Sequence, residues 1–122
     1  MAIALGVSAK QAANSATSMT TPGVASSASG STFVITVSDP NQSITVGDNK
    51  GNTYTQIGTT LTAGSTKLSM WRCENGTGGS GHTATVTWTS GTSDCVITFA
   101  EITGAAAASF DVPAQAFDNT NP

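Results

Sequence analysis

His82 is the only histidine in the chain, and its imidazole can act as a general base if a carboxylate orients it. If residues 82–89 and 94–101 form a hairpin about Gly91, position 82 faces Glu101 at the open end. The alternative is a structural pair, a cross-strand bond that pins the sheet. No nucleophile can be singled out among 21 threonines and 15 serines, so we expect the His82–Glu101 pair to be structural.

The expected hairpin is supported by apolar alternation in both of its strands. In this register three apolar residues of one strand lie beside three of the other, so that one side of the hairpin is apolar throughout. These residues are Ala84, Val86 and Trp88 in the first strand and Cys95, Ile97 and Phe99 in the second. The other side of the first strand is a row of threonines, which is ordinary on a solvated sheet face.

Oxygen-bearing side chains cluster in the sequence DNKGN at residues 48–52. Asp48, Asn49 and Asn52 carry oxygens of the kind that bind Ca²⁺. Their spacing lacks the carboxylates of an EF-hand loop. A glycine-containing β-turn, whose Asp and Asn side chains bond the local backbone, explains the same residues. We therefore expect a turn here, with no metal and no cofactor.

Three aromatic side chains, Tyr54, Trp71 and Trp88, are candidates for a sugar-stacking platform, because aromatic faces suit carbohydrate CH groups. Trp88 belongs to the apolar stripe, so we expect it in the core. Trp71 lies on the face of its strand opposite Leu68 and Met70, and one of these two sets can be exposed. We expect Trp71 and Tyr54 to line the core or a subunit interface, with a glycan-facing surface as the alternative.

The two cysteines, Cys73 and Cys95, lie at opposite ends of the expected strand layout. Cys73 closes the strand at 66–74, whereas Cys95 follows the turn after the next strand. That strand separates them by roughly 20 Å, at about 3.3 Å per residue. A disulfide needs Cα atoms within about 7 Å, so we expect none. Cys95 is expected to be a buried apolar residue beside Trp88, and Cys73 to be close to solvent or to a neighbouring subunit.

The composition indicates one β-rich domain with a weakly charged surface. Only 9% of the 122 residues are charged, while threonine and glycine are abundant, and these two favour strands and turns respectively. Four basic residues against seven acidic ones leave no electrostatic footprint for nucleic acid. No segment approaches the roughly 18 apolar residues of a membrane span. We expect neither nucleic acid nor membrane as a partner.

Alternating apolar and polar residues predict the strands that must position these side chains. We expect strands at 17–21, 31–39, 43–47, 53–58, 66–74, 82–89 and 94–103, a loop at 60–65 and a weaker candidate strand at 111–117. This number of short strands predicts an all-β fold, an antiparallel two-sheet sandwich of jelly-roll or Greek-key type.

The sandwich is expected to occupy residues 17–118, between an extended N-terminal arm and a polar tail. The arm, residues 1–16, lacks the apolar density to fold alone, so we expect it to become ordered only against a partner. The tail comprises residues 119–122. The first seven residues lack the basic and apolar regions of a signal peptide.

Three stretches of the sequence form an ordered set: DNKGNTY at 48–54, WRCENGTGGSGHTATV at 71–86 and FAEITG at 99–104. Together they resemble a β-sandwich module, with the pattern DxxGNxY, GG..HTVTV and AExSG, of bacteriophage virion proteins and bacterial surface proteins. The resemblance covers about residues 17–104. It implies an extracellular or virion scaffold and supplies no catalytic residues.

The resemblance favours a structural virion protein rather than an enzyme. We expect a capsid decoration (cement) protein, made in the host cytoplasm, that binds the outer surface of a bacteriophage capsid. Its expected partners are the major capsid protein and further copies of itself, as a dimer or trimer. The alternative is a glycan- or receptor-binding module of a phage tail fibre or bacterial surface protein.

The expected strand layout predicts two free thiols in each chain. Titration of the denatured, unreduced protein with a thiol reagent should detect both. A chain with no free thiols that still runs as a monomer on a non-reducing gel would contradict this layout.

Overall fold

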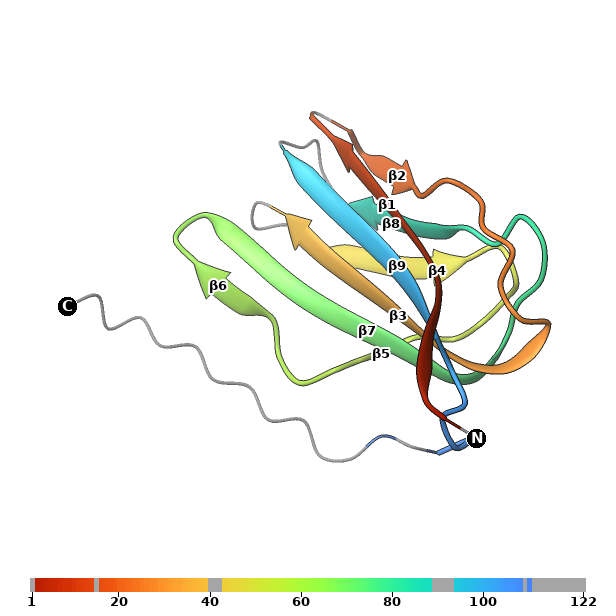
Figure 1. Cartoon of the computed structure of the whole chain (residues 1–122). Coiled ribbons are helices and arrows are strands. Elements are labelled where there is room, and N and C mark those ends of the chain that lie inside the picture. Colours follow the sequence, from red (N-terminus) through yellow and green to blue (C-terminus); the bar gives the residue numbers. More distant parts are fainter. Residues whose placement is uncertain (1, 15, 40–42, 89–93, 109, 111–122) are drawn as a thin grey trace.

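The computed structural model describes residues 2–14, 16–39, 43–88, 94–108 and 110. In this part of the chain all regular structure is β, and the strands form two antiparallel sheets packed together (Figure 1). The predicted all-β, two-sheet sandwich is therefore confirmed. Among the described residues, the structure contains no helix long and apolar enough to cross a membrane.

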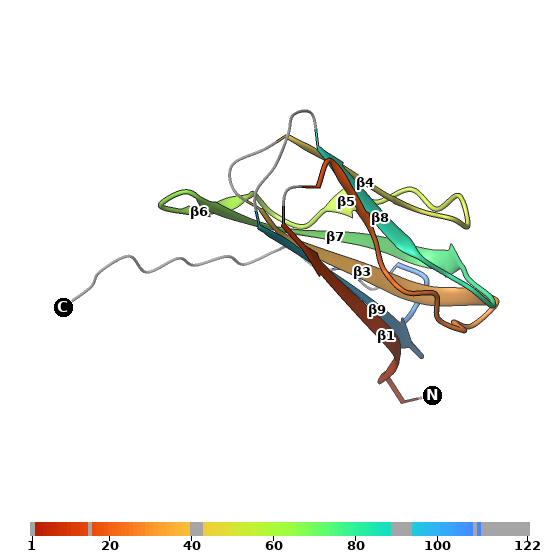
Figure 2. The same cartoon turned by 90° about the horizontal axis from the view of Figure 1, so that it is seen from above.

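The two sheets differ in size. The six-stranded sheet has the order β1-β9-β3-β7-β5, with β6 also pairing β7. Its strands are β1 (Ala4–Ala13), β3 (Ser29–Asp39), β5 (Thr55–Gln56), β6 (Leu61–Ala63), β7 (Thr66–Thr77) and β9 (Cys95–Thr103). The three-stranded sheet has the order β2-β8-β4, from β2 (Ser18–Thr20), β8 (Ala84–Trp88) and β4 (Ile44–Asp48). In both Figure 1 and Figure 2, β6 lies beyond the smaller sheet.

The core lies between the sheets and consists of the side chains that alternate inward. Phe33, Ile35 and Val37 of β3 have no exposed surface, and neither do Ile97 and Phe99 of β9. Burial of each such side chain stabilises the fold by about 1.5–3 kcal/mol. From the smaller sheet, β8 contributes Ala84, Val86 and Trp88, and β2 contributes Met19. The alternation seen in the sequence thus identifies the core correctly.

The predicted hairpin between residues 82–89 and 94–101 is wrong. β8 pairs with β2 and β4, whereas β9 pairs with β1 and β3, so the two strands belong to different sheets. Their apolar residues share one core as expected, but Val86 and Ile97 reach it from opposite sides. Alternation determines which face of a strand is buried and leaves its hydrogen-bonded neighbour undetermined.

The segment predicted to be an N-terminal arm, residues 1–16, contains β1, the edge strand of the larger sheet. β1 pairs antiparallel with β9, with Ala9 opposite Phe99 and Ala13 opposite Cys95. The bulky inward side chains of β9 supply the apolar surface that β1 lacks. Main-chain hydrogen bonds to β9 hold the segment in the sheet. Amino-acid composition does not indicate such bonds, so the sequence did not predict this strand.

The other differences from the expected strand layout are small. The loop expected at 60–65 contains β6, which pairs with β7. β7 continues three residues past the expected end at position 74. The candidate strand at 111–117 and the polar tail at 119–122 lie outside the described residues, so the predictions for them stay predictions.

Both cysteines are free, as predicted. Cys95 is buried in the core cluster that includes Trp88, and burial near Asp39 raises the pKa of its thiol to about 12. Cys73, expected near solvent, is also buried, because its side of β7 faces the interior. Burial, followed by the charges of Asp48 and Glu74, raises the pKa of the Cys73 thiol as well.

The pairing of β1 with β9 predicts slow hydrogen exchange in the isolated protein. Amides of residues 8–13 that bond to β9 should exchange more slowly than those of the exposed residues 106–108, because their opening requires separation of the strands. Mass spectrometry of peptic fragments, or NMR, measures this. Equally fast exchange in both segments would show that residues 1–16 are an arm after all.

Candidate functional site

His82 lies in the interior beside the aromatic core. Its side chain has no exposed surface, and its backbone forms an isolated antiparallel bridge with Val24. The imidazole packs edge-on against Phe33 and Phe99, with ring centroids 4.7 and 4.8 Å apart. A polar ring enclosed in this way requires a hydrogen-bond partner for each nitrogen.

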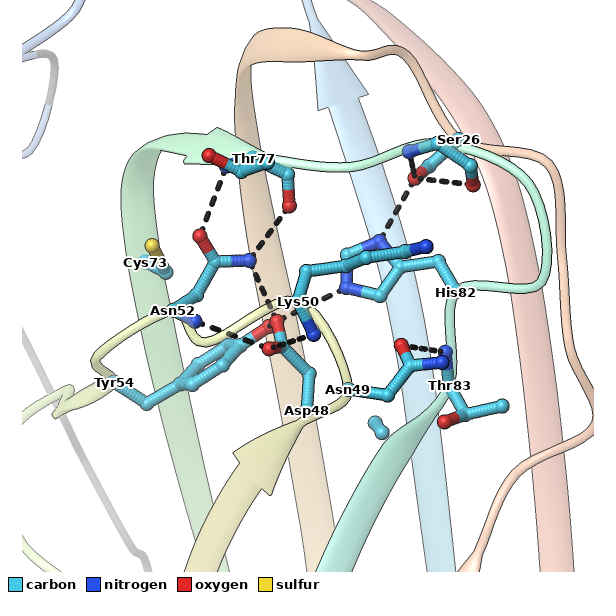
Figure 3. Close-up of polar contacts among 12 residues, drawn as sticks. Ser26, Asp48, Asn49, Lys50, Asn52, Tyr54, Cys73, Thr77, His82 and Thr83 are labelled. Carbon is cyan, nitrogen blue, oxygen red and sulfur yellow. Dashed lines mark hydrogen bonds and ion pairs between the residues drawn. The ribbon is translucent and has the colours of Figure 1, made fainter.

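Ser26 and Asp48 supply these two partners. The Ser26 Oγ lies 2.8 Å from His82 Nδ1, and the Asp48 Oδ2 lies 2.9 Å from His82 Nε2 (Figure 3). A ring protonated on Nε2 satisfies both neighbours, because Nε2–H donates to the carboxylate while Nδ1 accepts from the serine hydroxyl. Ser26 comes from the β2–β3 connection, His82 from the β7–β8 connection just before β8, and Asp48 from the end of β4.

Serine, histidine and aspartate are also the residues of a hydrolytic triad, but this arrangement differs from one in two respects. In a triad the serine bonds Nε2 and the aspartate bonds Nδ1, whereas here the ring is reversed. In addition, Ser26 is buried, and its hydroxyl accepts a hydrogen bond from Gly79 N at 3.1 Å, so it is not presented to a substrate as a nucleophile would be. The geometry is suited to bracing three segments against one another.

The Asp48 carboxylate is the centre of this network and accepts five hydrogen bonds. Its Oδ1 accepts from the backbone N–H groups of Lys50 and Asn52, at 2.9 and 3.1 Å. Its Oδ2 accepts from Asn52 Nδ2 at 2.6 Å, Tyr54 OH at 2.8 Å and the His82 ring. Figure 3 shows these groups converging on the carboxylate.

The hydrogen bonds lower the pKa of Asp48. Burial alone would raise it, but donors from Asn52, His82, Tyr54 and Lys50 outweigh burial, so the pKa lies below its ordinary value. For Tyr54, burial and the hydrogen bond to Asp48 both act in one direction and raise the pKa of the phenol. The carboxylate is therefore held in its charged form.

Asn49 joins the 48–52 turn to the segment between β7 and β8, and Asn52 joins it to the end of β7. Asn49 Oδ1 accepts from Thr83 N at 3.0 Å, and its Nδ2 donates to Gly81 O at 2.8 Å. Asn52 Oδ1 accepts from Thr77 N at 2.9 Å, and its Nδ2 also donates to Thr77 O at 2.8 Å. The oxygens considered as calcium ligands are thus acceptors of N–H groups. The turn interpretation fits these contacts. Within the described ranges no three His, Cys, Asp or Glu side chains are grouped so that they could hold a metal ion.

Glu101 forms a second buried network, and the predicted His82–Glu101 pair is wrong. Its Oε1 accepts from Ser27 N at 2.8 Å and from Ser31 Oγ at 2.7 Å, and Oε2 accepts from Val7 N at 3.4 Å. Burial would raise the pKa of Glu101, but these bonds outweigh it and lower the pKa. The pairing was wrong because β8 and β9 are in different sheets. Glu101 instead holds the β2–β3 connection and β1.

Two glycines let the backbone approach these networks closely. A Cβ on Gly78 would lie 2.1 Å from Ser27 O and 2.3 Å from Ser26 Oγ. A Cβ on Gly6, in the bulge of β1, would lie 2.5 Å from Glu101 Oε2. Any larger residue at either position would displace a hydrogen-bonded group, so the glycines are part of the site.

The aromatic residues singled out in the sequence lie in different places. Tyr54 is partly buried and directs its hydroxyl inward to Asp48, while Trp88 is in the core. Trp71 is partly buried at one end of the core, and its Nε1 donates to Ser69 Oγ at 3.1 Å. Leu68 and Met70, on the opposite face of β7, are the exposed set.

Comparison with known proteins finds no matching family model, no matching curated protein and no matching solved structure. The motifs can still be interpreted from geometry. Asp48, Asn52 and Tyr54 of the first stretch meet His82 of the second, and Glu101 of the third holds Ser27, next to Ser26. Ser26 had no signal of its own, because it lies in a low-complexity segment rich in serine.

Neutralising the central carboxylate should destabilise the fold. We expect Asp48→Asn to lower the free energy of unfolding by about 2–4 kcal/mol, since it removes a buried charge that several donors require. Asp94→Asn is the matched control at an exposed position and should cost less than about 0.5 kcal/mol. Urea denaturation measures both, and equal stability of the two variants would contradict the bracing role.

Stability should also decrease in acid. The folded-state pKa values of Asp48 and Glu101 lie below their ordinary values, which are about 3.9 and 4.3 in an unfolded chain. The unfolded chain therefore takes up protons first, so the stabilisation is complete above about pH 5 and is lost as the pH falls through the folded-state pKa values. Glu101→Gln should flatten this dependence, measured by urea denaturation at several pH values, whereas an unchanged slope would exclude Glu101 as its source.

Proposed function

We propose that this protein is a structural component of a virion, a decoration protein that binds the outer surface of a bacteriophage capsid. The proposal is supported by the resemblance of three motifs to virion β-sandwich modules. It is also supported by the geometry of the site, where Ser26, His82 and Asp48, the side chains that could take part in a reaction, are bonded to one another and brace the fold. The observation that carries it is a contrast between the two outer faces of the sandwich.

The outer face of the six-stranded sheet, here called the apolar face, carries several large exposed apolar side chains, with hydroxyls such as those of Thr36 and Thr98 among them. Its exposed or partly exposed apolar side chains come from four adjacent strands: Leu5, Val34, Leu68, Met70, Val96 and Ile102. Leu5 is 70% exposed, and Leu68, Val96 and Met70 are each about 40% exposed (45, 43 and 39%). Large exposed apolar side chains gathered on one face are a feature of interaction sites.

Charge is sparse on this face and largely neutralised. Arg72 and Glu74 of β7 form an ion pair at 3.5 Å, and the Phe110 ring covers the Arg72 guanidinium at 3.5 Å. Lys10 of β1 is the other charged side chain that alternates outward in the described strands. A matching partner surface is apolar and weakly charged, and we assign that surface to the capsid shell.

The outer face of the three-stranded sheet carries no large apolar side chain in its described strands. Its outward side chains are hydroxyls, and Thr20 and Thr85 are hydrogen-bonded across the strands at 2.9 Å. Ser18, Thr87 and Thr45 form the next row of the sheet. This face is suited to solvent, so the proposed orientation places the larger sheet on the capsid and the smaller sheet outward.

The proposal includes the expected partners and location. These are the major capsid protein, assembly with identical subunits as a dimer or trimer, and a place on the outer surface of the virion. Light scattering of the purified protein measures the self-assembly. A second candidate function, a glycan- or receptor-binding module of a tail fibre or surface protein, is favoured by one observation, the cleft beside Trp71 discussed below.

A charge in the apolar face should weaken capsid binding. We expect the native protein to bind capsids that lack it in a fixed stoichiometry, and Met70→Asp to reduce this binding at least about tenfold, because an unpaired carboxylate would be desolvated in the interface. Thr87→Asp is the matched control, with the same carboxylate at the centre of the opposite face. Cosedimentation with capsids measures both.

Two outcomes would count against the proposal. Failure of the native protein to bind any capsid stoichiometrically would remove the function itself. Equal loss of binding in Met70→Asp and Thr87→Asp, with both variants folded, would leave the assignment of the face without support.

A further inference from the structure

A cleft opens where the smaller sheet stops covering the larger one. It has a volume of about 270 Å³ and lies between the ends of β3 and β4 on one side and β5, β7 and the β5–β6 connection on the other. Its lining includes Asp39, Gln56, Thr60, Lys67, Ser69 and Trp71. This volume is slightly below the roughly 300–1,000 Å³ of pockets for drug-sized ligands, so it is suited to a small unit.

Trp71 provides the apolar surface of the cleft. One part of the indole packs against the core, and the hydrogen bond from Nε1 to Ser69 Oγ fixes the orientation of the ring. This bond engages the only polar group of the ring, and Trp71 lines the cleft, so the ring offers carbon surface to a ligand. A rigid aromatic face is suited to stacking against the CH face of a pyranose ring.

Polar side chains line the cleft around Trp71. Gln56 donates from Nε2 to Thr60 Oγ1 at 2.9 Å, which holds both side chains in place and leaves the Gln56 carbonyl as an acceptor. Asp39, only 3% exposed, lies opposite Lys67 in the β3–β7 register. The cleft thus combines acceptors, donors and hydroxyls, the set that binds vicinal sugar hydroxyls.

Charge balance selects the class of sugar. Asp39 and Lys67 contribute one negative and one positive charge, so the lining of the cleft has no net charge. An acidic sugar would gain from Lys67 but would be opposed by the buried carboxylate of Asp39. A neutral pyranose has no charge for the Asp39 carboxylate to repel.

We propose that this cleft binds a neutral hexopyranose unit of an oligosaccharide, with the sugar ring stacked on Trp71 and its hydroxyls bonded by Gln56 and Lys67. This proposal is independent of capsid binding. In β7, Met70 belongs to the outer apolar face and Trp71 to the cleft, because adjacent residues of a strand point to opposite sides. The two activities can therefore be separated by neighbouring substitutions.

The experiment is a binding screen followed by titration. The native protein is tested against neutral oligosaccharides of glucose, galactose, mannose and N-acetylglucosamine, with lactose and sialyllactose as a neutral and acidic pair. Binding is followed by tryptophan fluorescence, in which Trp71 reports on the cleft because Trp88 is buried in the core. We expect at least one neutral sugar to shift the emission and lactose, if bound, to bind better than sialyllactose.

The variants distinguish stacking from an indirect effect. Trp71→Ala should weaken binding of the neutral sugar about tenfold or more, and Gln56→Ala should weaken it several-fold, with both affinities measured by calorimetry. Met70→Ala is the control and should bind as the native protein does. Gln56 is a surface residue of a two-residue strand, so its variant tests the cleft even if Trp71→Ala fails to fold.

Three results would overturn the proposal: no neutral sugar binds, the Trp71→Ala and Gln56→Ala variants bind as tightly as the native chain, or sialyllactose binds better than lactose. Any of these can occur while capsid binding is intact. Conversely, loss of capsid binding in Met70→Asp leaves sugar binding in place, so failure of one proposal is distinguishable from failure of the other.

Discussion

The fold depends on the cost of keeping one carboxylate, that of Asp48, away from water. A buried charge is tolerated only when donors replace its lost hydration. Two backbone N–H groups, an amide, a phenol and an imidazole meet this requirement. Each donor belongs to a segment that must then approach the end of β4. The 48–52 turn, the chain before β5 and the start of β8 are positioned together for this reason.

A second carboxylate secures the same region from the other sheet. Asp48 reaches the β2–β3 connection through His82 and Ser26, and Glu101 reaches it directly at Ser27 N. Among the strands of the described residues, six of the eight connections between successive strands lead from one sheet to the other, so short hairpins do little to fix the relative position of the sheets. The two buried networks fix the sheets relative to each other at the adjacent residues Ser26 and Ser27. The Glu101 network also holds β1 through Val7 N.

The sequence predicted the faces of strands better than their neighbours. Phe33, Val86 and Ile97 alternate with polar residues, and such alternation reports burial directly. The pattern does not show whether the chain forms a hairpin after Trp88 or crosses to the other sheet. The predicted contact between His82 and Glu101 was wrong for this reason. β1 was missed because main-chain bonds and the side chains of β9 stabilise it. The 48–52 turn was predicted from local chemistry, but its bond to His82 joins residues 34 positions apart.

The geometry of β7 places the two proposed binding surfaces on opposite sides of one strand. The polar brace lies near one end of the strand, where Asn52 bonds Thr77, while Met70 and Trp71 lie farther along it. Because this brace ties the segments that surround β7, the alternation of Met70 and Trp71 between the outer face and the cleft is held in register. A slip of one residue would exchange the two surfaces. The hydrogen bonds between Asn52, which also donates to Asp48, and Thr77 of β7 oppose such a slip, so the interior hydrogen bonds help to determine which residues lie on each surface.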